Sequence, residues 1–93
     1  MEYSVTHLFS LGRLVKTPGA DELIKEGLKT LPLVKRHVTG DWSDMTEEDQ
    51  KANALAVAYS YRVFSAYETE HGKIWIITEA DRSATTILLP SEY

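Results

Sequence analysis

The stretch RVFSAYETEHGKIWIITEADRSATTILL, residues 62–89, decides the fold because it predicts three β-strands joined by two tight turns. Residues 62–68 have the composition and length of a strand, in which successive side chains lie on opposite faces. Gly72 ends the following loop and can take the positive φ of a hairpin turn. The alternation divides this first strand between two faces, one with Val63, Ser65 and Tyr67, the other with Phe64 and Ala66.

The second predicted strand, Lys73–Thr78, is apolar on both faces, which is typical of a central strand. Residues 80–83 predict another tight turn, and residues 84–89 a last strand that Pro90 stops. The three strands form an antiparallel meander. On the central strand, Trp75 and Ile77 share one face and Ile74 and Ile76 the other.

Capping signals upstream of the meander predict two short helices. The first begins after Thr17, which suits the N-cap position because its hydroxyl can accept a backbone N–H, and Pro18 suits the first helical position. It is expected to end near Lys29, because Gly27 weakens it. The second covers residues 31–38, with Gly40 at the left-handed position that follows a helix.

A third, longer helix is predicted after Thr46, whose hydroxyl again suits the N-cap. Acidic residues fill its first turn, where they complement the helix dipole. Apolar side chains then recur at helical spacing: Ala52, Leu55, Ala56 and Tyr59. This stripe predicts the face that packs against the sheet.

At the N-terminus, residues 4–9 and 11–15 predict one or two short strands, with Gly12 as a bulge or turn. The sequence therefore predicts an α+β fold. Two short helices and one longer helix pack on an antiparallel sheet of three C-terminal meander strands plus an N-terminal strand. The length of 93 residues favours a single domain over residues 1–93.

Composition narrows the function classes. The chain has no cysteine, which excludes disulfides, thiolate zinc sites and a cysteine nucleophile, and favours the cytoplasm. Residues 1–40 carry six basic and four acidic side chains, a net charge of +2, whereas residues 41–93 carry four basic and ten acidic ones, a net charge of −6. The acidic half disfavours a broad nucleic-acid surface, although Lys29, Lys35 and Arg36 offer a small basic patch. No apolar run is long enough to span a membrane, so no membrane partner is expected.

The densest acidic cluster follows Gly40, in the loop and first helical turn that contain Asp41, Trp42, Asp44, Glu47 and Glu48. One interpretation is a negatively charged docking face with Trp42 as its aromatic anchor, since tryptophan is favoured at binding hot spots. The alternative is local chemistry: the acids complement the helix dipole, and Trp42 packs into the core.

Asp81 and Arg82 form a second candidate, in the turn before the last strand. Arg82 suits bidentate binding of a carboxylate or phosphate. The alternative is a turn that Asp81 stabilises through its own backbone, with Arg82 paired to Glu79 or Asp81.

Motifs for catalysis, cofactors and metals are missing from the sequence. It has no nucleophile elbow, phosphate-binding glycine loop or paired metal ligands. His37, Asp41 and Asp44 have spacings compatible with a divalent cation, but without the paired ligands of a zinc site. We therefore expect no metal and no cofactor.

The chain resembles a family of small, uncharacterised proteins carried on bacterial plasmids, integrative elements and prophages. Residues 17–20, 36–37 and 40–42 carry the resemblance, and the stretch WIITEADRSATTILLPSEY, residues 75–93, is its most distinctive part. Some members are labelled as type I restriction subunits, but the chain is shorter than the cofactor-binding domain that such a subunit needs. The resemblance implies no catalytic residues. The motif positions to test are Asp41-Trp42, Asp81-Arg82 and Leu88-Leu89-Pro90.

These observations favour a non-enzymatic accessory protein that binds a host or element-encoded protein, with inhibition of CRISPR or restriction machinery as the most specific form. A small RNA-cleaving toxin and a weak DNA-binding regulator are the alternatives. A homodimer is compatible with each, because three helices need not cover both faces of the central strand.

Overall fold

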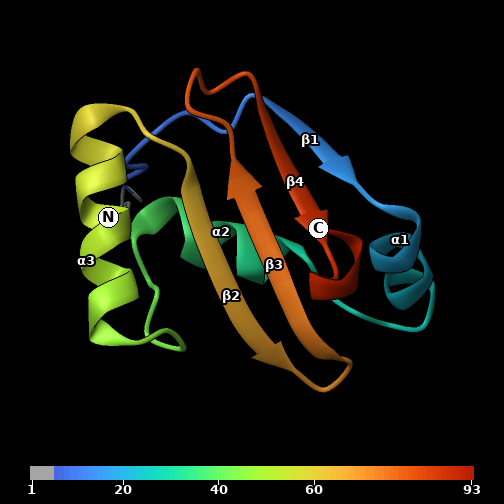
Figure 1. Ribbon diagram of the computed structural model, residues 1–93. Coiled ribbons are helices and arrows are strands. Elements are labelled where there is room, and N and C mark those ends of the chain that lie inside the picture. Colours follow the sequence, from blue (N-terminus) through green and yellow to red (C-terminus); the bar gives the residue numbers. More distant parts are fainter. Residues whose placement is uncertain (1–5) are drawn as a thin grey trace, which may run out of the picture.

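The computed structural model describes residues 6–93, and this part of the chain has the α+β fold expected from the sequence (Figure 1). It contains three α-helices, four strands and one short 3-10 helix. In chain order these are β1 Arg13–Lys16, α1 Pro18–Lys25, α2 Leu31–Thr39, α3 Glu47–Tyr59, β2 Val63–Thr69, β3 Gly72–Thr78, β4 Ala84–Leu88 and η1 Pro90–Glu92.

The four strands form one sheet in the order β1-β4-β3-β2. The meander is antiparallel as predicted, and β3 lies inside the sheet between β4 and β2. β1 joins the far side of β4 in parallel, with Arg13 opposite Ala84, so the complete sheet is mixed. Of the predicted strand at residues 4–9, residues 4–5 lie outside the described part and residues 6–9 do not form a strand.

Helix α2 crosses one face of the sheet behind β2 and β3, and α1 lies at the side of the sheet next to β1 and β4 (Figure 1). On this inner face the alternating strand residues point toward the helices. The resulting core consists of Ala20, Leu28, Leu33, Val34, Tyr67, Ile74, Ile76 and Ile87. Its members from β2 and β3 are those that the alternation assigned to one face.

The helices begin where the capping signals predicted. The Thr17 hydroxyl accepts the N–H of Ala20, and the Thr46 hydroxyl accepts the N–H of Asp49. α2 ends at Thr39 and is followed by Gly40, which has a φ of +86°. α1 ends at Lys25, four residues before the expected end near Lys29, because Gly27 takes a φ of +115° that no helix accommodates.

One helix presents a different face from the one expected. α3 lies beside β2 at the edge of the sheet (Figure 1), and its buried residues are Asn53 and Ala56. Of the predicted stripe, Ala56 alone is buried, and Ala52, Leu55 and Tyr59 are exposed. The side chain of Asn53 makes hydrogen bonds to the backbone of β2. The side of the helix that carries Asn53 therefore faces the strand.

Candidate functional site

The predicted acidic loop is folded around a cation from its own chain. Arg36, on α2, donates to the carboxylates of both Asp41 and Asp44, with closest distances of 3.0 and 3.2 Å. Its guanidinium also stacks 4.5 Å from the centre of the Tyr67 ring. These hydrogen bonds lower the pKa of both carboxyl groups and raise the pKa of Arg36. Two of the loop's negative charges, and one cation of the expected basic patch, are thus paired internally.

Trp42 lies in the core rather than on the surface. The side chain is buried, and its indole Nε1–H donates to the carbonyl of His37 at 3.2 Å. It packs with Ala56 and Val63 in the small core between α3 and β2. The local-chemistry interpretation of Trp42 therefore agrees with its position, and the indole is not available as a surface anchor.

Glu47 and Glu48 are both exposed in the first turn of α3, next to the Thr46 cap. Unlike Asp41 and Asp44, neither carboxylate makes an ion pair in the described part of the chain. Their charge faces solvent, beside the positive end of the helix.

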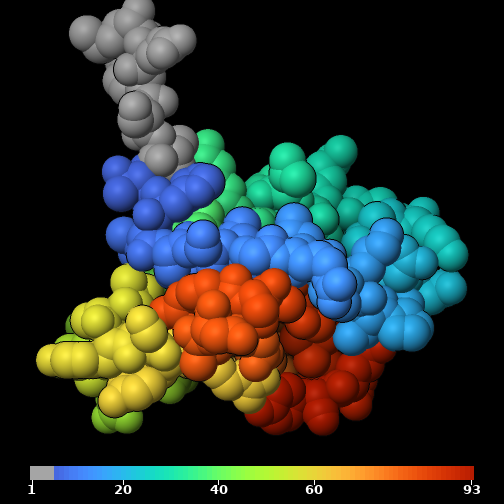
Figure 2. Space-filling view, turned by 90° about the horizontal axis from the view of Figure 1, so that it is seen from above, coloured from blue at the N-terminus to red at the C-terminus, as the bar shows by residue number. Residues whose placement is uncertain are grey.

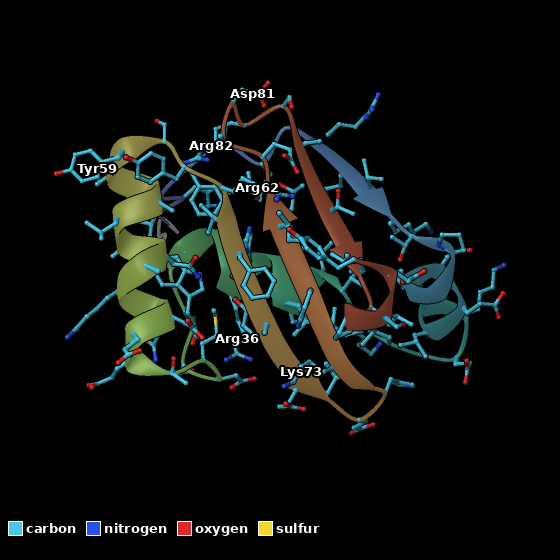
Figure 3. All side chains as sticks on the ribbon, in the orientation of Figure 1. Arg36, Tyr59, Arg62, Lys73, Asp81 and Arg82 are labelled. Carbon is cyan, nitrogen blue, oxygen red and sulfur yellow. The ribbon has the colours of Figure 1, made fainter. Side chains whose placement is uncertain are left out.

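Asp81 and Arg82 occupy the turn between β3 and β4, and they point in different directions (Figure 3). The Asp81 carboxylate accepts the N–H of Ser83 at 2.9 Å, as the turn interpretation predicted. Arg82 has a φ of +61°, and its guanidinium donates to carbonyls rather than carboxylates. The acceptors are the carbonyls of Ala56 and Tyr61, at 3.0 and 2.7 Å, and those of Glu79 and Ala80.

Arg82 thereby ties the turn to the end of α3. A cation at the C-terminal end of a helix complements the helix dipole. Seen from above, this turn lies between the N-terminal segment and the end of α3 (Figure 2). Gly12 packs its backbone directly on the backbone of Arg82 and Ser83. The side chain of Arg82 thus joins the turn to the end of α3, and the backbone of the turn contacts the N-terminal segment at Gly12.

Sequence reasoning missed a buried polar chain at the centre of the molecule. His37 has no exposed surface, and its two ring nitrogens lie 2.5 Å from the Ser65 hydroxyl and 2.8 Å from the Thr78 hydroxyl. The Thr78 and Thr85 hydroxyls are 2.7 Å apart, and Thr85 donates to the carbonyl of Leu11 at 2.6 Å.

The bond from Thr85 to Leu11 fixes the direction of the other hydrogen bonds as far as Nε2 of His37. Because Thr85 gives its proton to Leu11, it must accept from Thr78, which in turn accepts from Nε2–H of His37. Burial, with a smaller effect of the Arg82 charge, lowers the pKa of His37 to about 4, so the ring is neutral at neutral pH. With the proton on Nε2, the Nδ1 atom then accepts from Ser65. This row of hydrogen bonds links α2 to strands β2, β3 and β4 and to the segment before β1.

This geometry separates the three residues considered for a metal. His37 faces the hydroxyl chain, whereas Asp41 and Asp44 face Arg36. Across residues 6–93, no group of three or more His, Cys, Asp or Glu side chains has the arrangement of a metal site. No helix in the same range is long and apolar enough to cross a bilayer.

A further exposed apolar surface lies on the outward side of α3. Leu55 and Tyr59 are 56% and 66% exposed, and Tyr61, just after the helix, is 62% exposed. The rings of Tyr59 and Tyr61 lie 6.2 Å apart, and Tyr59 points away from the sheet (Figure 3). With Ala52, these residues form the α3 stripe. The sequence signal for it was present, since the helical spacing was recognised, but it was assigned to the core.

Comparison with known proteins gives no match: no family model, curated protein or solved structure is significantly similar to the chain.

Proposed function

We propose that this chain is a non-enzymatic protein-binding module whose docking surface is the α3 stripe. The observation that carries this proposal is that Ala52, Leu55 and Tyr59 recur at the spacing of a core-facing helix and yet face solvent. Tyrosine provides much contact area with a polar end, which suits a surface that is wet alone and buried in a complex. Contiguous exposed apolar residues of this kind mark interaction sites.

Charge defines the class of partner. Glu48 lies one helical turn before Ala52 and therefore on the same side of α3, with Glu47 beside it. The stripe thus has an acidic end whose carboxylates make no ion pair within residues 6–93, in contrast to those of Asp41 and Asp44. A partner segment with an apolar ridge flanked by lysine or arginine complements it.

The remaining candidate residues hold α3 in position through contacts on its buried side and at its two ends. Arg36 holds Asp41 and Asp44 in the loop that leads into α3, and Trp42 packs under the helix. Arg82 binds the carbonyls of Ala56 and Tyr61, at the other end of the stripe. We assign these residues to positioning α3, and Glu47 and Glu48 to partner contact.

The biological setting of this proposal rests on the sequence resemblance alone. On that basis, the partner is a host or element-encoded protein, and the most specific form of the role is inhibition of a CRISPR or restriction complex in a cell that carries a mobile element.

The test compares three tagged proteins as bait in lysate of such a cell: the unaltered chain, a Leu55→Ser/Tyr59→Ser double variant, and Leu31→Ser. Leu31 is also an exposed leucine, at 76%, but lies on α2 outside the stripe. We expect a partner that the unaltered chain and Leu31→Ser retain and the double variant loses. Calorimetry with the purified partner should then show the same order of affinity.

Two outcomes would contradict the proposal. A partner retained equally by all three baits places the docking surface elsewhere. Specific cleavage of RNA, or gel shifts with DNA at low salt, would favour the toxin or the regulator instead.

A further inference from the structure

The outer face of the sheet, opposite α2, carries a second apolar surface. In the front view no described helix crosses β2 and β3, and η1 lies toward β4 (Figure 1). Phe64, Ala66 and Trp75 are half-buried there, and the rings of Phe64 and Trp75 meet edge to face at 4.8 Å. The 70% exposed ring of Tyr93 lies against Trp75. Phe64, Ala66 and Trp75 thus remain partly accessible, whereas Ile77 and Leu88 on the same face are buried.

The outer residues along β2 and β3 follow one repeated pattern. Each row begins with a cation, continues with two apolar residues and ends with an acid: Arg62, Phe64, Ala66 and Glu68 along β2, and Lys73, Trp75, Ile77 and Glu79 along β3. Because the strands are antiparallel, opposite charges meet at both ends. Arg62 pairs with Glu79 at 3.3 Å, and Lys73 with Glu68 at 3.3 Å.

Figure 3 shows Arg62 and Lys73 at opposite ends of the two strands. The apolar centre is therefore framed by a charge of each sign at each end, and the face, which we call the outer sheet face, has no net charge. A nucleic acid would need an excess of cations here. Two copies of a chain with a net charge of −4 repel each other overall, and this repulsion is weakest at a face that carries no net charge.

We propose that the outer sheet face binds a second copy of this chain, in a two-fold symmetric dimer whose β2 strands run antiparallel across the interface. A two-fold interface uses the same patch on both copies and must be self-complementary. In this arrangement the start of β2 lies over the end of β2 in the second copy. Arg62 then faces Glu68, and Lys73 faces Glu79.

Along β2, side-chain size is also complementary in this arrangement. The large ring of Phe64 lies over the small Ala66 of the second copy, and by symmetry Ala66 lies under its Phe64. Large side chains that oppose small ones allow two sheets to interdigitate at the usual spacing of about 10 Å. The ion pairs at each end become four-charge networks, which fix the direction of the second copy more than they add affinity. This dimer goes beyond the proposed function, because the α3 stripe lies outside the outer sheet face.

The experiment measures mass by sedimentation equilibrium across a concentration series, with Glu68→Lys, Arg62→Glu and an equimolar mixture of the two. We expect the unaltered chain to dimerise at or below about 1 mM. In a Glu68→Lys dimer, the introduced lysine faces Arg62 twice, and in an Arg62→Glu dimer, the introduced glutamate faces Glu68 twice. The dissociation constant of each variant should rise at least about tenfold.

The mixture is the decisive sample. In a mixed dimer, Arg62 of one variant faces Glu68 of the other, and the two introduced charges face each other with opposite sign. Association should therefore return when the two variants are combined. Glu70→Lys makes the same charge change in the exposed hairpin loop, outside the outer sheet face, and should dimerise like the unaltered chain.

Quenching of tryptophan fluorescence adds a readout at the face itself. Trp42 is buried, so acrylamide reports mainly on the half-buried Trp75, which the dimer should protect. Circular dichroism and thermal unfolding show whether each variant is folded. A monomeric unaltered chain, charge variants that dimerise alone, or a folded mixture that stays monomeric would each overturn the proposal. A failed partner pull-down would leave it unaffected.

Discussion

The side-chain amide of Asn53 pairs with the backbone of Phe64 as a neighbouring strand would. Its Nδ2 donates to the Phe64 carbonyl at 2.7 Å, and its Oδ1 accepts the Phe64 N–H at 3.1 Å. Further along β2, the carboxylate of Asp44 accepts the N–H of Glu68 at 3.1 Å. An unpaired strand edge is a template for aggregation. α3 and the loop before it therefore occupy two positions on the free edge of β2.

Replacing Asn53 with Ala should lower the free energy of unfolding by about 2–3 kcal/mol, because two backbone groups of an edge strand lose their partners beside the core. Urea denaturation measures this change. Ala54→Ser, on the exposed side of the same helix turn, is the control and should cost less than about 0.5 kcal/mol. Equal effects of the two substitutions would show that the amide pairing does not stabilise the fold.

Acid should destabilise the protein through His37. Burial lowers its pKa to about 4, below the 6.5 of the unfolded chain. Between these values the unfolded chain binds the additional proton. The stability contributed by neutral His37 is therefore complete above pH 6.5 and decreases as the pH falls toward 4, by about 3 kcal/mol.

Urea unfolding at a series of pH values measures this loss, and an NMR titration of the His37 ring identifies its source. Asp41 and Asp44 have pKa values below their ordinary 3.8. The stability that their ion pairs with Arg36 contribute is therefore lost in a more acidic range than the one in which His37 acts. A His37 ring that titrates near 6.5 in the folded protein would refute the buried neutral state.

Truncating Leu55 should hardly affect stability. Because the side chain is 56% exposed, Leu55→Ala should change the free energy of unfolding by less than about 0.5 kcal/mol. Ile76→Ala, in the fully buried centre of β3, should cost about 2–5 kcal/mol by the same thermal or urea measurement. A loss of that size for Leu55→Ala would show that the Leu55 side chain is packed in the core, and the proposed docking surface would then have no basis.

Two glycines with positive φ should respond differently to alanine. Gly72, with a φ of +99°, has open space around its Cα, so Gly72→Ala should cost only the backbone strain of about 1 kcal/mol. Gly12 has a φ of +64°, and a methyl group there would collide with the backbone of Arg82 and Ser83. Gly12→Ala should lower the midpoint of thermal unfolding at least about twice as much as Gly72→Ala does. Similar midpoints would show that the N-terminal segment does not pack on the turn.

The parts of the fold that depend on neighbours in sequence were predictable. Hydroxyl caps at Thr17 and Thr46, the left-handed Gly40 and the alternation along β2 each act over a few residues. The parallel pairing of β1 with β4 was not, because no local pattern distinguishes it from an antiparallel neighbour.

The candidate site was less predictable, and α3 shows why. Its sequence is apolar on more than one side, so periodicity alone could not choose between Leu55 and Ala56. The choice depends on Asn53, whose partner lies on a separate strand. Likewise alternation placed Ser65 on the same face as Val63 and Tyr67, but its hydrogen bond to His37 links residues 28 positions apart.

The large sequence separation between β1 and β4 also determines the order in which the sheet can assemble. The meander closes through turns of a few residues, and such hairpins form within microseconds. β1 must instead find β4 across a loop that separates Thr17 from Ile87 by 70 positions, and the entropy of closing that loop precedes any contact that rewards it. We therefore expect folding to be limited by the docking of β1, with the edge of β4 transiently exposed until that step is complete.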